Sequence, residues 1–206
     1  MGKLATIKES AVLLNKILEY VHNDDYKSNI AVNIKSRECV DVEAICKKMR
    51  VKKDIREYIM ERSEQDWYWV NICESAVSEF KKKLLKKFKS LDKDEVYQFG
   101  RSGGWISLGL AERFYDVRES VNWLLDEDHI GKIYAQLLGD QEEREDALAA
   151  INDVYEKVSG LDCKGMLKAI EYTEEAHRKF SFEKYIRADI RRKIRETKEY
   201  EERKAA

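Results

Sequence analysis

Hydrophobic side chains recur every three to four residues along most of the chain, which is the spacing of one buried face of a helix. In the first half this pattern predicts helices over residues 6–22, 42–49, 53–62 and 63–88. A T-x-x-E capping box at Thr6 and Glu9 marks the expected start of the first helix. The first half is therefore expected to be a set of amphipathic helices joined by short polar segments.

The second half repeats the pattern, with glycines after two of the helices. It predicts helices over residues 116–125, 128–138, 141–159, 162–170 and 181–194. Gly139 and Gly160 are suitable residues for ending the second and third of these. The helix over 141–159 carries Leu148, Ile151 and Val154 on its apolar stripe. From Arg195 onward the stripe is gone, so we expect the tail to fray.

One segment breaks the helical pattern. Residues 96–99 and 105–108 are rich in aromatic and β-branched side chains, and they flank the glycine-rich residues 100–104. This predicts a β-hairpin over about 95–108, and alternating polarity permits a short strand near 29–35. The 206 residues include no proline, and four of the nine glycines lie within positions 100–109. The expected fold class is mainly α with one small hairpin.

The hairpin also suggests how the chain is divided. Residues 1–91 are expected to form an N-terminal helical half, 92–110 a hairpin insert and 111–206 a C-terminal helical half. Because no long flexible linker separates these segments, one continuous domain is equally compatible with the sequence. The amphipathic helices can close on themselves or on a second copy of the chain, so a homo-oligomer stays open.

Charge is distributed unevenly although the net charge is only −1. Residues 1–91 hold 19 basic and 14 acidic side chains, residues 92–162 hold 7 and 17, and residues 163–206 hold 13 and 9. The chain thus has an acidic middle between two basic arms, a feature that concerns partners rather than fold.

The first basic arm suggests nucleic-acid binding. Its densest cluster consists of Lys47, Lys48, Arg50, Lys52, Lys53 and Arg56. Residues 41–59 resemble a helix-turn-helix, a motif that places its second helix in the DNA major groove. The chain departs from that pattern because Arg50 stands where glycine is usual and Ile55 is one place off the expected buried position. A helical hairpin with a solvated basic face explains the same residues.

The acidic middle suggests a different partner. Glu142, Glu143 and Glu145, with further acids at 126–128, could imitate the charge of a nucleic acid and occupy a basic groove on another protein. A role in solubility explains the same charges.

Enzymatic and cofactor signatures are weak. The three histidines are scattered, no local nucleophile motif occurs, and Glu174-x-x-His177 supplies only half of a di-metal pattern. The loop 100–104 lacks the Lys-Ser/Thr of a P-loop and the spacing of a dinucleotide fingerprint. The four cysteines are widely spaced and are read as free, buried thiols. We therefore expect no enzyme, no cofactor and no metal.

Hydropathy bears on location. No apolar run approaches the roughly 18 residues of a membrane span, and the first residues lack a signal-peptide pattern. The expectation is a cytoplasmic protein without a membrane partner. The 43 % hydrophobic residues and 21 aromatic residues provide enough apolar material for a core and argue against disorder.

The string Gly100-Arg101-Ser102-Gly103-Gly104-Trp105, with the apolar strand that follows it, resembles a hairpin motif of small, largely uncharacterised bacteriophage proteins. The resemblance covers about 14 of the 206 residues. It implies a phage or mobile-element origin, a class in which many small proteins inhibit host defences, anti-CRISPR proteins among them. It also implies a location in the host cytoplasm.

These observations lead to a first hypothesis. The chain is expected to be a non-enzymatic binding protein that engages a host protein or nucleoprotein, such as a defence nuclease, through Arg101, Ser102 and Trp105 and through the acidic residues at 142–145. Arginine and tryptophan are enriched at interaction hot spots, although Trp105 could equally anchor the hairpin in the core. The alternative hypothesis is DNA or RNA binding through residues 41–59.

Overall fold

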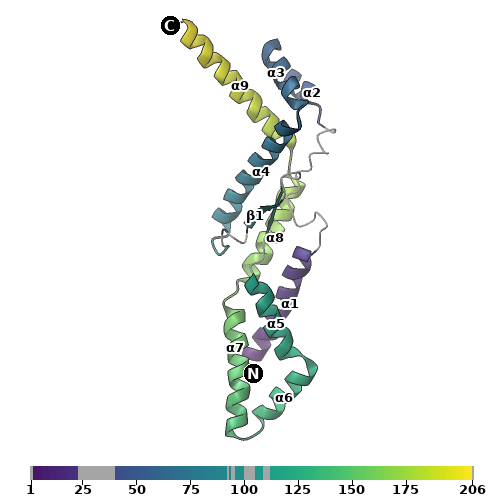
Figure 1. Ribbon diagram of the computed structural model, residues 1–206, viewed down its shortest axis with the longest axis vertical. Coiled ribbons are helices and arrows are strands. Elements are labelled where there is room, and N and C mark those ends of the chain that lie inside the picture. The colour runs from purple at the N-terminus through teal and green to yellow at the C-terminus, as the bar shows by residue number, and fades with distance from the viewer. Residues whose placement is uncertain are drawn as a thin grey trace. The chain divides into compact units, whose positions relative to one another are not determined.

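The computed structural model describes residues 2–22, 40–91, 93, 96–99, 105–108 and 112–205. The helices are α1 (Gly2–His22), α2 (Val42–Lys48), α3 (Lys53–Ser63), α4 (Asp66–Lys87), α5 (Glu112–Leu125), α6 (Glu127–Leu137), α7 (Gln141–Ser159), α8 (Cys163–Arg178) and α9 (Phe182–Ala205) (Figure 1). Two short strands, β1 (Val96–Phe99) and β2 (Trp105–Leu108), form a two-stranded sheet. The mainly helical class predicted from the sequence is confirmed. The strand proposed near 29–35 and the loop 100–104 lie outside the described residues.

The chain groups into two compact units, each built from separate stretches of sequence. Unit 1 comprises Met1–Ser28, Lys87–Tyr97 and Leu108–Tyr172, and unit 2 comprises Asn29–Lys86, Gln98–Ser107 and Thr173–Ala206. The units therefore group the segments differently from the sequential division at residues 91 and 110, which stays a prediction.

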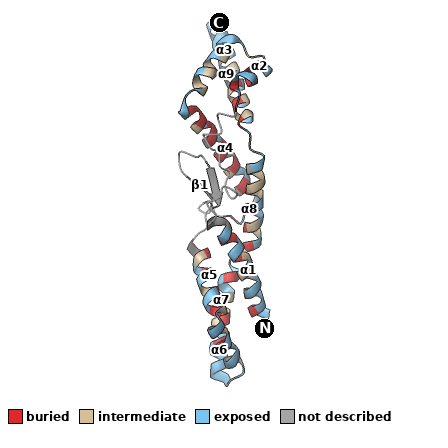
Figure 2. Cartoon of the chain, turned by 90° about the vertical axis from the view of Figure 1, so that its right-hand side faces the viewer, coloured by how far each residue is buried: buried red, intermediate tan, exposed pale blue. Residues whose placement is uncertain are grey.

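Unit 1 is a helical bundle around α7. Helices α1, α5 and α6 each pack against α7, and α1 also packs against α5. The buried side chains include Ile17, Leu124 and Val154, one from each of α1, α5 and α7. Figure 2 shows such buried positions as stripes on these helices, whereas α6 is exposed over most of its length and buries Ile133. Helix α6 thus packs against the rest of unit 1 mainly through one side.

Unit 2 places α9 against α2 and α3, with α4 contributing to the same core. Ile45, Ile59 and Ile186 are buried on α2, α3 and α9. The indole of Trp69 on α4 meets the ring of Phe182 edge to face, with centroids 5.4 Å apart. Such aromatic pairs add to the free energy gained from burial alone.

Two expectations about helix ends are wrong. Helix α1 already begins at Gly2, and Thr6 donates its hydroxyl hydrogen bond to the carbonyl of Gly2 in the preceding turn instead of capping the helix. Helix α9 continues to Ala205 although its apolar stripe ends near Arg195. Lys, Arg and Glu are good helix formers, so propensity supports this helix beyond its packed part.

Candidate functional site

The acidic side chains predicted to bind a partner lie at the start of α7, and all of them are exposed. Asp140 caps the helix: its carboxylate accepts from the backbone N–H of Glu143 at 3.0 Å, and the carboxylate of Glu143 accepts from the backbone N–H of Asp140 at 3.3 Å. This reciprocal pair is a capping box, so Glu143 has a structural role. Glu142 and Glu145 take no part in this capping box, and Glu145 accepts a hydrogen bond from the side chain of Gln141 at 2.9 Å.

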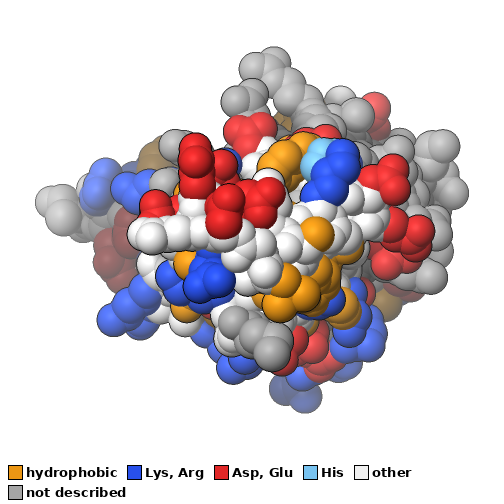
Figure 3. All heavy atoms as spheres, turned by 90° about the horizontal axis from the view of Figure 1, so that it is seen from below, with side chains coloured by type: hydrophobic (Ala, Val, Ile, Leu, Met, Phe, Trp, Pro, Cys, Tyr) orange, Lys and Arg blue, Asp and Glu red, His pale blue; other side chains and the backbone are white. Residues whose placement is uncertain are grey.

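Beside these acids lies an apolar groove between the start of α1, the second half of α6 and the first half of α7. Its volume is about 920 Å³, and its apolar lining is formed by Leu4, Tyr134, Leu137, Leu138, Leu148 and Ile151. Leu138 is 87 % exposed, and Tyr134 and Leu148 are also exposed. In Figure 3, which looks onto the α6–α7 end, acidic side chains stand next to hydrophobic ones. We call the groove together with Glu142 and Glu145 the α6–α7 face.

The lysines at the groove are already engaged within unit 1. The ammonium group of Lys3 donates to the side-chain oxygen of Asn152 at 2.7 Å and lies 5.0 Å from the ring centre of Tyr155. Lys8 lies 5.9 Å from the ring centre of Tyr134. Neither contact removes the positive charge of these lysines, so a partner at the α6–α7 face would meet Lys3 and Lys8 in the groove lining and the exposed acids at the start of α7.

The predicted nucleic-acid residues lie on α2, on the turn after it and on α3, all in unit 2. Arg50 occupies the turn with φ of 54°, the left-handed conformation for which glycine is preferred. Lys52 and Lys53 open α3 and are exposed, and Arg56 is half-buried. Lys47 forms an ion pair with Glu43 at 2.9 Å, whereas Lys48 is exposed on the last turn of α2. The structure therefore brings the six basic side chains onto one helical hairpin.

The two departures from the helix-turn-helix pattern have structural explanations. Arg50 adopts the backbone conformation that the turn needs, at some cost in strain for a side chain with a Cβ. Ile55 is buried with 4 % of its surface exposed, together with Cys46 and Ile59, so the hairpin closes on its own apolar positions. Ile55, one residue before Arg56, therefore belongs to the core of the hairpin.

The residues predicted at the hairpin tip cannot be placed in a site. Arg101 and Ser102 lie outside the described residues, and Trp105 begins strand β2 without a described side chain. Their assignment to a partner surface stays a prediction.

Sequence reasoning missed a second groove, in unit 2. It has a volume of about 940 Å³ and lies along one face each of α4 and α9, with Arg62 of α3 in its lining. The lining mixes polar and apolar side chains and carries Arg62, Lys82, Arg192 and Arg195 among its charges. Lys82 lies in a basic run of the sequence at 81–89, and Arg192 and Arg195 lie in another at 187–195, so the sequence indicates phosphate contacts there. Because the four residues are up to 133 positions apart, no local motif could have indicated that they line one groove. We call it the α4–α9 groove.

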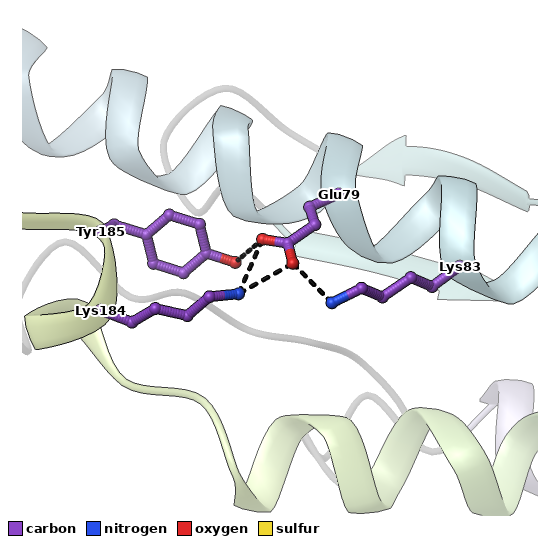
Figure 4. Close-up of polar contacts among 4 residues, drawn as sticks. All are labelled: Glu79, Lys83, Lys184 and Tyr185. Carbon is purple, nitrogen blue, oxygen red and sulfur yellow. Dashed lines mark hydrogen bonds and ion pairs between the residues drawn. The ribbon is translucent and has the colours of Figure 1, made fainter. Parts of the chain in front are cut away.

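Glu79 of α4 is the centre of a polar network in this groove (Figure 4). Its carboxylate accepts from the ammonium groups of Lys184 at 2.8 and 2.9 Å and of Lys83 at 2.5 Å, and from the hydroxyl of Tyr185 at 3.0 Å. The hydrogen bonds from Lys184 and Lys83 lower the pKa of Glu79 to about 2. Burial, and then the hydrogen bond to Glu79, raise the pKa of Tyr185 above its ordinary value.

The three described cysteines are free, buried thiols. Burial raises the pKa of the Cys73 thiol to about 12, and it also raises the pKa values of Cys46 and Cys163. Such thiols are poor nucleophiles because little thiolate forms near neutral pH. Within the described part of the chain, no group of three or more His, Cys, Asp or Glu side chains is placed to hold a metal ion.

No described helix combines the length and the apolar character needed to span a membrane. Comparison with protein-family models, with curated proteins and with solved structures gives no match to this chain.

Proposed function

We propose that this chain is a non-enzymatic binding protein that engages another protein through the α6–α7 face. The observation that carries the proposal is the apolar groove of about 920 Å³ in which Leu138 is 87 % exposed. Single exposed leucines are common on protein surfaces, but a cluster in a groove beside charged residues is typical of an interaction site. Burying a leucine side chain contributes roughly 1.5–3 kcal/mol, so Leu138 and Leu148 together could anchor a complex.

The expected occupant is an amphipathic, basic helix of the partner. Helices dock into such grooves with apolar side chains spaced one turn apart, and their polar face then meets the rim. Glu142 and Glu145 are exposed on α7, the helix that also supplies Leu148 to the groove, and Lys3 and Lys8 in the groove lining contact Asn152 and aromatic rings. A basic surface thus gains complementary charge at this face, which favours both specificity and fast association.

The finer form of the proposal follows from the hairpin resemblance. A phage-encoded inhibitor of a host-defence nuclease would need to occupy a surface built for nucleic acid, and the acids at 142–145 supply charge of that sign. Arg101, Ser102 and Trp105 are proposed as additional contacts with such a host protein or nucleoprotein.

The test uses a fluorescein-labelled synthetic 18-residue helix of leucine and lysine, followed by fluorescence anisotropy with the full chain. We expect binding that weakens at least tenfold in the double variant Leu138→Ser/Leu148→Ser, and also in Glu142→Lys/Glu145→Lys. The matched control is Glu199→Lys/Glu202→Lys, which makes the same charge change on the exposed end of α9. If the control loses as much affinity as the α6–α7 variants, the groove is not the binding site.

Affinity capture from a bacterial lysate tests the finer form. A defence nuclease should be retained by the natural chain and released by the Glu142→Lys/Glu145→Lys variant. Retention that does not depend on these two residues would remove the acidic mimicry from the proposal.

The alternative proposal is DNA or RNA binding through residues 41–59. It is supported by Arg50, which adopts the left-handed turn conformation at the position where a helix-turn-helix has glycine. A salt-dependent gel shift is expected, and it should weaken in Lys52→Gln/Lys53→Gln/Arg56→Gln. The absence of any shift at low salt would eliminate this alternative.

A further inference from the structure

The α4–α9 groove is elongated along α4. Its lining residues on α4 run from Tyr68 to Lys82 and recur at intervals of one helical turn. At a rise of 1.5 Å per residue, this wall is about 21 Å long. A stacked nucleic-acid strand carries a phosphate about every 3.4 Å, so several phosphates would fit along such a wall.

The charges in the groove favour an anion. Four of its lining residues are basic, and three are acidic: Glu74, Glu79 and Asp189. Glu79 is neutralised by Lys83 and Lys184, and Asp189 and Arg192 neutralise each other, which leaves Arg62, Lys82 and Arg195 against Glu74. Unit 2 as a whole contains 25 Lys and Arg against 18 Asp and Glu, a net charge of +7. An anionic ligand therefore approaches a positive potential.

Arg62 is held by aromatic rings at one end of the groove. Its guanidinium carbon lies 4.6 Å from the ring centre of Trp67 and 5.2 Å from that of Tyr58, and Nη1 donates to the Tyr58 hydroxyl. Nε of Arg62 is buried without a hydrogen-bond partner in the described part of the chain, whereas the hydroxyl of Tyr68, which is 2 % exposed, faces the carboxylate of Asp189. A buried donor without a partner is unusual in native proteins, and an anion at this end of the groove would supply one for Arg62.

Trp67 adds a surface for stacking. Its side chain is 47 % exposed although it contacts Arg62. Proteins that bind single strands combine a basic groove with exposed aromatic rings on which bases stack. A duplex is recognised differently, by a projecting helix or strand that enters its grooves, whereas here the protein supplies the concave surface.

We infer that the α4–α9 groove binds single-stranded nucleic acid, with its phosphates along Lys82 and Arg195 and a base beside Trp67. This site belongs to unit 2, goes beyond the proposed α6–α7 face and does not depend on it. It also differs from the α2–α3 hairpin of the alternative proposal, because it uses other residues and a different form of nucleic acid.

The experiment measures binding of a fluorescein-labelled 15-residue oligothymidylate to the full chain by anisotropy, between 50 and 200 mM NaCl. The test variant is Lys82→Gln/Arg195→Gln, whose two side chains line the groove. For single strands the salt slope falls by about 0.7 for each phosphate contact removed, so we expect a slope about 1.4 smaller. The matched control is Lys81→Gln/Arg191→Gln, on the same two helices but outside the groove lining.

A second variant blocks the groove without changing its charge. Ser75→Trp places a large side chain on an exposed position of the α4 wall and should reduce the affinity at least tenfold. Circular dichroism of each variant verifies that the helices are retained.

Three results would overturn the inference. The first is no binding of the oligothymidylate at 50 mM NaCl, and the second is an equal loss of salt slope in the matched control. The third is that a 15-base-pair duplex binds at least as tightly as the single strand, and that this duplex binding is lost in Lys52→Gln/Lys53→Gln but is retained in Lys82→Gln/Arg195→Gln. That pattern would assign nucleic acid to the α2–α3 hairpin.

Discussion

Replacing Glu79 by Gln tests whether the network in Figure 4 stabilises unit 2. In the folded chain the pKa of Glu79 falls from 4.5 to about 2. At 1.36 kcal/mol per pKa unit, the ionised carboxylate would contribute at most about 3.4 kcal/mol. The side chain is 35 % exposed, however, so solvent screens its ion pairs, and exposed pairs contribute roughly 0.2–1 kcal/mol each. We therefore expect the free energy of unfolding to fall by about 1–2 kcal/mol at pH 7.

The pH dependence has a definite sign. Because the pKa of Glu79 is lower in the folded chain than in the unfolded chain, its contribution is complete above pH 4.5 and is lost as the pH falls towards 2. The difference between the natural chain and Glu79→Gln should accordingly be constant from pH 7 to about 5, shrink below 4.5 and vanish only below about pH 2.

The assay is urea denaturation followed by tryptophan fluorescence in a Trp123→Phe background. Trp123 is the tryptophan of unit 1, so the remaining tryptophans, at positions 67, 69 and 105, all belong to unit 2. With an m-value of about 1–2 kcal/mol per molar urea, the midpoint should move by about 1 M. Glu74→Gln, an exposed carboxylate on the same helix, is the control and should leave the midpoint unchanged. A Glu79→Gln difference that is as large at pH 3 as at pH 7 would refute the electrostatic reasoning.

The other predictions concern stability at single positions. Leu84→Ala should cost about 2–5 kcal/mol because its side chain is fully buried, whereas Leu138→Ala at 87 % exposure should change the free energy of unfolding by less than about 0.5 kcal/mol in urea titrations. Arg50→Gly should raise the melting temperature because glycine avoids the roughly 1–2 kcal/mol that a residue with a Cβ pays in a left-handed backbone, whereas Arg50→Val should lower it because the β branch adds to that cost. Asp140→Ala should destabilise unit 1 by about 1 kcal/mol in calorimetry through loss of the α7 capping box, and Glu142→Ala should not.

Periodicity predicted the helices because burial of one helical face is a local property of the sequence. It could not tell a core position from a docking position. Leu148 and Ile151 share one apolar stripe, yet Ile151 is buried and Leu148 is exposed at the rim of a groove. The difference depends on where α1 and α6 lie against α7, which is tertiary information. The predicted end of α9 was wrong for the converse reason, because the helix propensity of its charged residues extends that helix beyond its apolar stripe.

The candidate sites divide in the same way. The basic residues at 47–56 and the acids at 142–145 are contiguous in the sequence, so composition alone could indicate them. The α4–α9 groove combines Arg62, Lys82 and Arg195 from three helices, and only long-range packing brings them together. Arg50 shows a middle case: the sequence indicated a special turn position, and the left-handed backbone explains how a residue other than glycine occupies it.

The net charge of each unit is the strongest argument for the partner proposed for it. Along the sequence the charge changes sign twice, and the two units differ in the sign of their net charge: unit 1 has 14 basic and 22 acidic residues, whereas unit 2 has 25 and 18. Residues 1–28, with 4 basic and 4 acidic side chains, join the acidic unit, and residues 173–206, with 11 and 8, join the basic one. Unit 1 has a net charge of −8 and unit 2 a net charge of +7, although the whole chain has a net charge of −1. Each unit therefore favours a partner of the opposite sign. A basic protein at the α6–α7 face and a nucleic-acid strand in the α4–α9 groove satisfy both, which is the combination that a nucleoprotein presents.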